Sequence, residues 1–259
     1  MLSTFSAESY EQLWQDLVDS HPEEVREYFR LHKTRYYELF GAIEHYLKDK
    51  STPRLLEVGV SGFFPLYPKL FPDLRVVTID RPVEMGGAGA DYSVAQWKAE
   101  RHYNVDLNAH FLSNEWGTPA LGLFDYVVCA EVLEHLIVNP VEFISSLLGL
   151  LEPKGYLYLT TPNFFSHGHL GQIEGREHPM PVYPKRGENK DHHHHFREYS
   201  LQELVESTKE AGGTVIKADY SDCWDDEGIQ NRLLRDHPDQ SSNLVVVAQA
   251  RMAERGKRS

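Results

Sequence analysis

Two acids and a histidine in one short stretch offer the most direct chemistry in this chain. Glu131, Glu134 and His135 stand at positions i, i+3 and i+4, so on a helical turn they would share one face. A further histidine, His195, lies in a later stretch rich in histidine, glycine and proline. Imidazole changes its charge near neutral pH, which makes His135 and His195 candidate catalytic bases. A histidine at the start of a helix is often structural, so both roles stay open for His135.

A second group of polar residues closes short apolar runs earlier in the chain. The pattern predicts a βαβ unit with a strand at 55–58, a helix at 65–71 and a strand at 74–80. Such a unit leaves its ligand at the carboxyl ends of the strands, where Glu57 and Asp80 stand. Gly59 and Gly62 would allow a sharp turn there and a close approach of the backbone to a ligand.

The residues of this turn argue against a dinucleotide. A G-x-G-x-x-G loop counted from Gly59 would need glycines where Ser61 and Phe64 stand. Glu57 would also repel a pyrophosphate, whereas it suits a ligand with an amine, a sulfonium and no phosphate. S-adenosylmethionine fits that description. The alternative is that Glu57 and Gly59 simply end a buried strand.

The elements that must position these residues follow in order along the chain. Apolar residues at helical spacing predict helices over 7–49, and Asn139-Pro140 predicts the start of another helix. Ser200 is predicted to cap a later helix. Further strands are expected at 103–108, 124–130, 156–160, 214–218 and 243–250, with a turn at 153–155. The aperiodic stretch 164–198 is expected to be a lid or binding loop.

Composition narrows the class of protein. The 259 residues carry 26 basic and 39 acidic side chains, a net charge of −13, which disfavours nucleic-acid binding as the main task. No stretch resembles a signal peptide or is long enough to span a membrane, so we expect a cytoplasmic protein without membrane insertion. Nothing in the sequence indicates the oligomeric state.

Four sequence segments, in the order in which the family has them, resemble the class I S-adenosylmethionine-dependent methyltransferases, types 11 and 23 in particular. They are 56–59 (LEVG), 77–80 (VTID), 124–135 (FDYVVCAEVLEH) and 151–163 (LEPKGYLYLTTPN). The resemblance implies an α/β, Rossmann-like fold: a seven-stranded, mostly parallel sheet with an antiparallel last strand and helices on both faces. It also implies a helical extension at 1–50, a methyltransferase domain at 51–253 with the 164–198 insertion, and a tail at 254–259.

The resemblance transfers the cofactor site by position. Glu57 and Gly59 would flank the methionine part of S-adenosylmethionine, with Ser61 and Gly62 in the same turn. The ribose would be held by Asp80 beside Arg81, the adenine by Asp106 and Leu107, and the sulfonium would be bordered by Ala130 and Glu131. The chain departs from the family at Ser61 and Phe63, where glycines are usual.

A narrower resemblance concerns metal-assisted catalysis. The ubiquinone-pathway O-methyltransferases and the small-RNA 3′-terminal 2′-O-methyltransferases share the Glu-x-x-Glu-His spacing. It implies that a divalent ion, Mg²⁺ or Mn²⁺, could be held by Glu131, Glu134, His135 and His195. The alternative is that Glu131 contacts the cofactor and the histidines only line the pocket.

From these residues we expect an O-methyltransferase acting on a small hydroxylated acceptor, a glycan or a secondary metabolite. N- or C-methylation is the alternative within the class. The alternative from another class is a non-catalytic protein that binds S-adenosylmethionine or a partner with the same fold.

Overall fold

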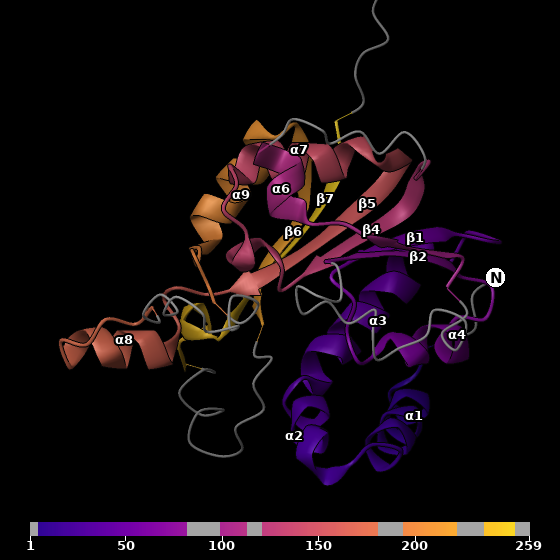
Figure 1. Ribbon diagram of the computed structural model, residues 1–259, viewed down its shortest axis with the longest axis horizontal. Helices are drawn as coiled ribbons and strands as arrows, with labels where there is room; N and C mark the ends of the chain where they lie inside the picture. Colours follow the sequence, from indigo (N-terminus) through magenta and orange to yellow (C-terminus); the bar gives the residue numbers. More distant parts are fainter. Residues whose placement is uncertain (1–4, 82–98, 113–120, 181–193, 222–235, 252–259) are drawn as a thin grey trace, which may run out of the picture.

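One seven-stranded sheet organises the computed structural model, which describes residues 5–81, 99–112, 121–180, 194–221 and 236–251 (Figure 1). The strand order is β3-β2-β1-β4-β5-β7-β6. β7 runs antiparallel to β5 and β6, whereas the pairs among β1 to β5 are parallel. The bounds are β1 (Arg54–Val58), β2 (Arg75–Asp80), β3 (Arg101–Asn104), β4 (Phe124–Ala130), β5 (Leu151–Pro162), β6 (Gly213–Ser221) and β7 (Asn243–Ala250). This confirms the predicted α/β fold with its antiparallel last strand.

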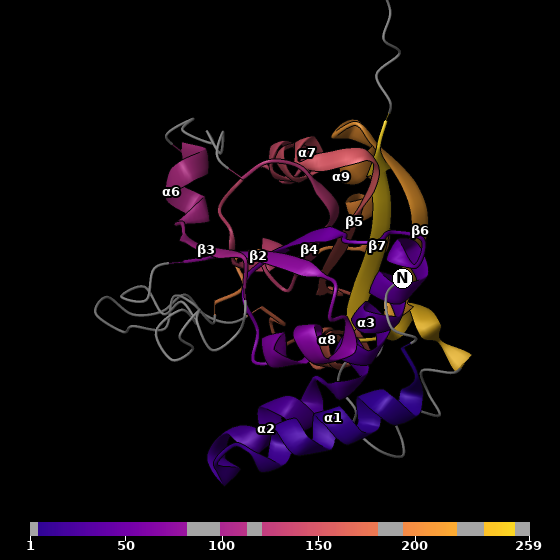
Figure 2. The ribbon, with the colours of Figure 1, turned by 90° about the vertical axis from the view of Figure 1, so that its right-hand side faces the viewer.

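Helices cover both faces of the sheet (Figures 1 and 2). One face packs on α1 (Ala7–Asp19), α2 (Glu23–Leu31), α3 (Lys33–Leu47) and α4 (Tyr67–Leu70), and the other on α6 (Leu107–Leu112), α7 (Pro140–Gly149) and α9 (Leu201–Glu210). Alternation along each strand separates the two cores. In β1, for example, Leu55 joins the core of α1 to α4, and Leu56 joins the core of α6, α7 and α9.

Capping residues fix where α7 and α9 begin. The Asn139 side chain accepts a 2.9 Å hydrogen bond from the backbone N–H of Val141, and Pro140 occupies the first turn, as predicted. Ser200 and Glu203 form a reciprocal capping box at the start of α9. These caps lie immediately after the segments that carry the candidate histidines, so they help to fix where those segments end.

The predicted third strand is displaced along the chain. Instead of spanning 103–108, β3 ends at Asn104, and α6 begins at Leu107. Asp106 accepts a 3.2 Å hydrogen bond from the backbone N–H of Ala109, which satisfies one donor of that first turn. The strand Arg101–Asn104 is a partly exposed edge without an apolar run, so hydrophobic pattern could not locate it.

Two other predicted elements have different bounds in the structure, one next to a proline and one at a predicted turn with glycine. The predicted helix 65–71 is a 3₁₀ turn, Phe64–Leu66 (η1), followed by the short α4, which ends before Pro72 because a residue preceding proline disfavours helix. The predicted turn 153–155 lies inside β5 as a bulge, with Lys154 at a φ of 69°. β5 therefore begins at Leu151 rather than at 156.

The stretch 164–198 contains a helix that the sequence pattern did not predict. The helix α8 (His167–Glu174) follows the cap Ser166 and buries none of its residues, so it has no apolar periodicity to detect. It projects away from the sheet in Figure 1. Residues 181–193 lie outside the described part, so the role of this stretch as a lid stays a prediction, as do the domain bounds.

No helix in the described part of the chain is both long and apolar enough to cross a membrane.

Candidate active site

The predicted cofactor residues meet at one edge of the sheet. β2, β1 and β4 are adjacent and parallel, and Asp80, Glu57 and Ala130 lie at or next to their carboxyl ends. In a doubly wound sheet this edge is where a ligand binds. The structure therefore brings the residues predicted for the methionine, ribose and sulfonium parts of the cofactor to the same region.

Glu57 is a buried acid with an unused oxygen. It is only 2% exposed, and its Oε2 atom has no hydrogen-bond partner within the described residues. Burial, and next the negative charge of Asp80, raise the pKa of Glu57 well above its usual range. A buried carboxyl group of this kind keeps its proton unless a cationic partner stabilises the ionised form. The ammonium of a methionine moiety would supply one, so the residue fits the expected cofactor.

The turn after β1 shows how this chain accommodates its unusual residues. Gly59 has a φ of 80°, and a Cβ atom there would lie 2.5 Å from Cγ2 of Val132, so glycine is required. Ser61 keeps a negative φ, and its Oγ accepts a 3.2 Å hydrogen bond from the backbone N–H of Phe63. Phe63 stacks on Tyr36 of α3 at a centroid distance of 3.9 Å. The departures from the family pattern thus fasten the N-terminal helices to the turn.

The residues predicted for ribose and adenine lie at the ends of β2 and β3. Asp80 accepts a 2.8 Å hydrogen bond from the backbone N–H of Arg81. Asp106 caps α6, and Leu107 is buried in the core beneath it. Asp106 therefore has a structural role at the helix start, which does not depend on adenine.

Arg35 is a site residue that the sequence reasoning missed. It lies on α3, is 6% exposed, and places Nη1 3.6 Å from Oε2 of Glu131. Its positive charge also lowers the pKa values of Glu57 and Glu134 in part, against the stronger effect of their burial. A signal was present: Arg35 precedes Leu39 and Ile43 by one and two helical turns on a fully buried stripe. A basic residue on such a stripe indicates a charged partner.

Glu131 does not share a face with Glu134. Its Oε1 atom accepts hydrogen bonds from Oγ1 of Thr160 at 2.8 Å and from Nδ2 of Asn243 at 2.9 Å. Glu134 instead accepts a 3.0 Å hydrogen bond from Thr161, the next residue of β5. Neighbouring strand residues point to opposite faces, so the two acids are held on different sides of the sheet.

The backbone explains why the predicted helical face does not form. Glu131 has a φ of 57°, in the left-handed region, and the 3₁₀ turn η4 (Leu133–His135) begins only after it. The spacing i, i+3, i+4 therefore does not lie on one helix. Glu131 is held by β5, β7 and α3, and only three of the four predicted metal ligands are brought together.

Those three residues form a compact cluster. Ligand atoms of Glu134, His135 and His195 all lie within 4.8 Å of one another, and the two imidazole rings are 4.8 Å apart in an edge-on arrangement. Phe196, next to His195, donates its backbone N–H to the Glu134 carbonyl oxygen at 2.7 Å. Burial, and then the charge of Glu131, raise the pKa of Glu134 well above its usual range. This cluster is the natural location for proton transfer or metal binding.

Both histidines use Nδ1 to anchor the ring. The Nδ1 atom of His135 lies 2.9 Å from the carbonyl oxygen of His194, and that of His195 lies 2.7 Å from Oε1 of Glu198. A carbonyl or carboxylate oxygen can only accept, so each Nδ1 carries the proton. In the neutral rings Nε2 then carries the lone pair, and that of His135 lies 3.6 Å from Oε1 of Glu134.

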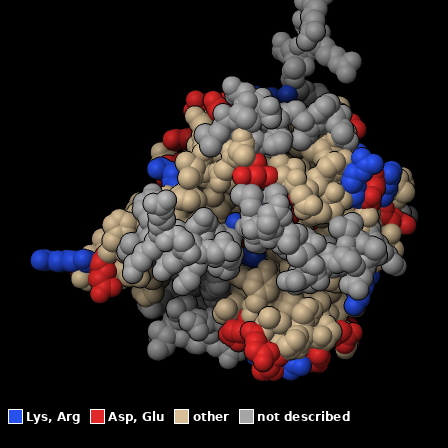
Figure 3. Space-filling view, in the orientation of Figure 1, with Lys and Arg blue, Asp and Glu red and all other residues tan. Residues whose placement is uncertain are grey.

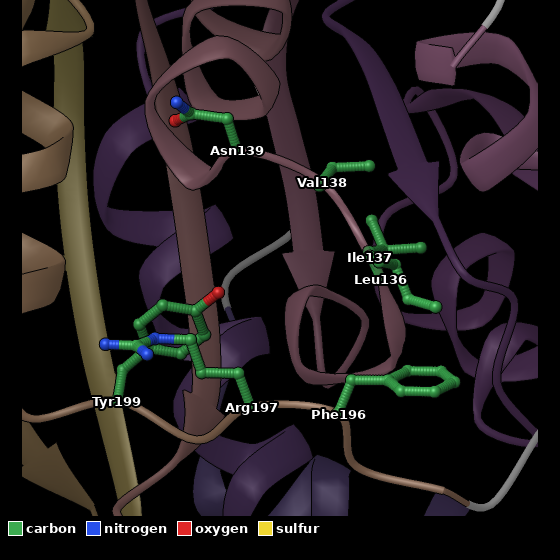
Figure 4. Close-up of a pocket in the computed structure, with 7 residues that line it drawn as sticks. All are labelled: Leu136, Ile137, Val138, Asn139, Phe196, Arg197 and Tyr199. Carbon is green, nitrogen blue, oxygen red and sulfur yellow. The ribbon is translucent and has the colours of Figure 1, made fainter.

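A pocket of about 420 Å³ lies beside this cluster (Figure 4). Its lining comes from the two segments that follow the histidines: Leu136, Ile137, Val138 and Asn139 after His135, and Phe196, Arg197 and Tyr199 after His195. In Figure 4 the apolar side chains Leu136, Ile137 and Phe196 lie together, and the Arg197 guanidinium lies over the Tyr199 ring. The lining is mainly apolar, with one cationic group.

Comparison with known proteins identifies the family. Residues 31–217, well over half of the chain, match the family model described as a methyltransferase domain. The chain belongs to this methyltransferase-domain family. The predicted resemblance to S-adenosylmethionine-dependent methyltransferases is therefore confirmed.

Curated relatives match this methyltransferase-domain chain over a limited stretch. The ubiquinone biosynthesis O-methyltransferase of Vibrio campbellii is 28% identical over 87 residues, which are 34% of this chain and 36% of that protein. The chain thus spans about a third of the length of such relatives.

Two solved structures share the fold. N-methyltransferase NodS from Bradyrhizobium japonicum WM9, in complex with S-adenosyl-L-homocysteine, has a TM-score of 0.51 at 15% identity, covering 94% of this chain and 98% of that chain. The [4+2]-cyclase SpnF has a TM-score of 0.51 at 16% identity, covering 82% and 80%. At these identities the likeness concerns the fold alone.

Proposed function

We propose that this protein transfers a methyl group from S-adenosylmethionine to a hydroxyl of a small acceptor. The observation that carries the proposal is the pair of adjacent imidazoles, His135 and His195, whose ring centroids lie 4.8 Å apart and whose Nδ1 atoms each face an acceptor oxygen. A sulfonium methyl is already activated, so the protein has to align the acceptor, exclude water and remove one proton. The histidine pair supplies the last of these functions.

The chain's own residues would hold the cofactor at the edge formed by β2, β1 and β4. Glu57 would pair its unused oxygen with the ammonium group, and Arg35 would face the carboxylate of the methionine part from α3. Asp80 would accept from the ribose hydroxyls. Asp106 and Leu107 would border adenine, and Ala130 would border the sulfonium.

A divalent ion is the second way in which the histidine cluster could act. Glu134, His135 and His195 would hold it, and when bound it would lower the pKa of the acceptor hydroxyl. The donor set fits such an ion, because Oε1 of Glu134 has no hydrogen-bond partner among the described residues and ligand atoms of Glu134, His135 and His195 all lie within 4.8 Å of one another. Two imidazoles with one carboxylate suit Mn²⁺ or a later transition ion better than Mg²⁺, which prefers oxygen ligands.

The neighbouring pocket favours one kind of acceptor. Its mainly apolar lining suits an aromatic or aliphatic metabolite better than a glycan, which would present hydroxyl groups on all sides. The net charge of −13 and the acidic side chains that gather near the α2 end in Figure 3 disfavour a nucleic acid. The names of the ubiquinone relatives support O-methylation rather than N-methylation.

A transfer assay tests this proposal. The purified chain is incubated with methyl-labelled S-adenosylmethionine and a panel of small catechols, phenols, amines and sugars, with and without a chelator. We expect label in a phenol or catechol, and we expect its loss in the double variant His135→Ala, His195→Ala. Loss of transfer with chelator and recovery with Mn²⁺ would select the metal version. Labelling of amines alone, or full activity in the double variant, would contradict the proposal.

A further inference from the structure

Glu198 occupies an unusual position for an acid. It lies three residues after His195 and two before the α9 cap, and its side chain is only 5% exposed. Its Oε1 atom is 2.7 Å from Nδ1 of His195. Its Oε2 atom has no hydrogen-bond partner within the described residues, although Nδ1 of His169 on α8 is 3.3 Å away. A carboxylate that is buried and only half satisfied is costly, which indicates a role beyond stability.

The chemistry of its contact with His195 determines the orientation of that ring. A carboxylate oxygen only accepts, so His195 must place its Nδ1–H toward Glu198, which leaves the lone pair on Nε2. The ring lies 4.8 Å from that of His135, and one of its nitrogens lies within 4.8 Å of ligand atoms of Glu134 and His135. In water, neutral imidazole favours the opposite tautomer. Without Glu198 the ring would therefore tend to carry a proton, rather than a lone pair, on Nε2.

The two histidines differ in what anchors them. His135 is held by a neutral backbone carbonyl, that of His194, whereas His195 is held by a carboxylate. A carboxylate behind an imidazole fixes the ring and stabilises the positive charge that the ring gains when Nε2 takes up a proton. This asymmetry makes His195 the ring better prepared for proton abstraction.

We propose that Glu198 is a positioning residue that holds the Nδ1–H of His195, so that the lone pair of this ring is on Nε2. The catalytic consequence of this contact rests on the proposed methyl transfer. As an acceptor oxygen bonds to the methyl carbon, the carbon–sulfur bond breaks and its electron pair goes to sulfur, giving a neutral thioether. The hydroxyl proton moves to Nε2 of His195, and Nδ1–H stays bonded to Glu198. If a metal is used, the same contact directs the Nε2 lone pair to the ion.

Nitrogen NMR of the full chain tests this geometry without any assay of activity. In protein labelled with ¹⁵N-histidine, the signals of His195 are assigned by their absence from His195→Gln. We expect the wild type to show a protonated Nδ1 and an unprotonated Nε2 at this residue. In Glu198→Ala the tautomer should reverse, and in Glu198→Gln, whose amide oxygen still accepts, it should be largely retained.

A matched control separates this effect from a general loss of structure. Glu203→Gln removes one negative charge five residues away, from a side chain that caps α9 and does not contact His195. We expect it to leave the His195 tautomer unchanged. Retention of the protonated Nδ1 of His195 in a folded Glu198→Ala overturns the proposal. If that variant does not fold, the wild type decides, because an unprotonated Nδ1 with a protonated Nε2 at His195 also overturns it.

Activity supplies the second measurement. Once an acceptor that the protein methylates is known, kcat can be measured for the variants. Glu198→Ala should lower kcat about 10–100-fold, the usual effect of removing such an anchoring partner, and should leave KM for S-adenosylmethionine unchanged. Glu198→Gln should recover part of kcat. An unchanged kcat in Glu198→Ala overturns the proposed consequence. A correct tautomer in a protein that methylates nothing would instead overturn the proposed function and leave the positioning role standing.

Discussion

Glu131 and Glu134 are held by adjacent threonines of β5, Thr160 and Thr161, and so lie on opposite sides of the sheet. The first acid is tied to the core of α1 to α4, where Arg35 approaches it to 3.6 Å. The second lies with the two histidines. We therefore infer that Glu131 stabilises the structure of the site, whereas Glu134 takes part in its chemistry.

The first prediction follows from that division. Glu131→Ala removes the acceptor of two hydrogen bonds and the ion-pair partner of a buried arginine, so it should lower the free energy of unfolding by about 2–4 kcal/mol. Urea denaturation measures this change. Glu210→Ala, which removes an exposed acid at the end of α9, is the control and should change stability by less than about 0.5 kcal/mol. Equal stability of the two variants would show that the Glu131 contacts contribute nothing.

Much of the fold could be predicted because its signals are local. The apolar runs of β1, β2 and β4 and the Asn139-Pro140 cap are short stretches whose residue types define the element. The edge strand β3 and the exposed helix α8 have no such signal, since neither carries a continuous apolar face. The prediction depends on a regular alternation of apolar and polar residues along the sequence, and neither element has one.

The site was predicted less completely, because its contacts join residues far apart in sequence. His135 and His195 were predicted and do lie together, but the Arg35–Glu131 and His195–Glu198 contacts depend on how α3 and the segment 194–200 pack. The prediction for Glu131 is wrong for a local reason: its left-handed φ interrupts the helical spacing on which the prediction depends. Residue types do not specify such a backbone state outside glycine.

The second prediction concerns pH. Burial raises the pKa of Glu57, so the folded chain keeps a proton that the unfolded chain releases near the ordinary value of 4.5. The folded state therefore binds more protons above this pH, and the free energy of unfolding of the wild type should fall as pH rises. Glu57→Gln cannot lose a proton there. Its stability relative to wild type should increase from pH 4 to pH 8, measured by urea denaturation.

The same residue should make cofactor binding depend on pH. Pairing with an ammonium favours the charged carboxylate, so S-adenosylhomocysteine should release a proton on binding and bind more tightly as pH rises. Calorimetry in two buffers of different ionisation enthalpy measures that proton. Glu57→Gln should bind about 10–100-fold more weakly and release none, whereas Glu210→Gln should behave as wild type. Proton uptake by the wild type would contradict this role.

The third prediction tests the α9 cap independently of chemistry. Ser200→Ala removes a hydroxyl that accepts from the backbone N–H of Glu203 at 3.2 Å, and should lower the free energy of unfolding by about 1 kcal/mol. Ser145→Ala, at an exposed position inside α7, should change it by less than about 0.5 kcal/mol. Thermal and urea unfolding both report the difference. Similar effects for the two serines would mean that the cap does not stabilise α9.

Titration calorimetry with S-adenosylhomocysteine and with NAD tests whether the edge formed by β2, β1 and β4 binds S-adenosylmethionine. We predict saturable binding of S-adenosylhomocysteine, weakened by about 1.5–3 kcal/mol in Asp80→Ala, and no binding of NAD. Tight binding of NAD together with no response to S-adenosylhomocysteine would show that this edge is a dinucleotide site and not a site for S-adenosylmethionine.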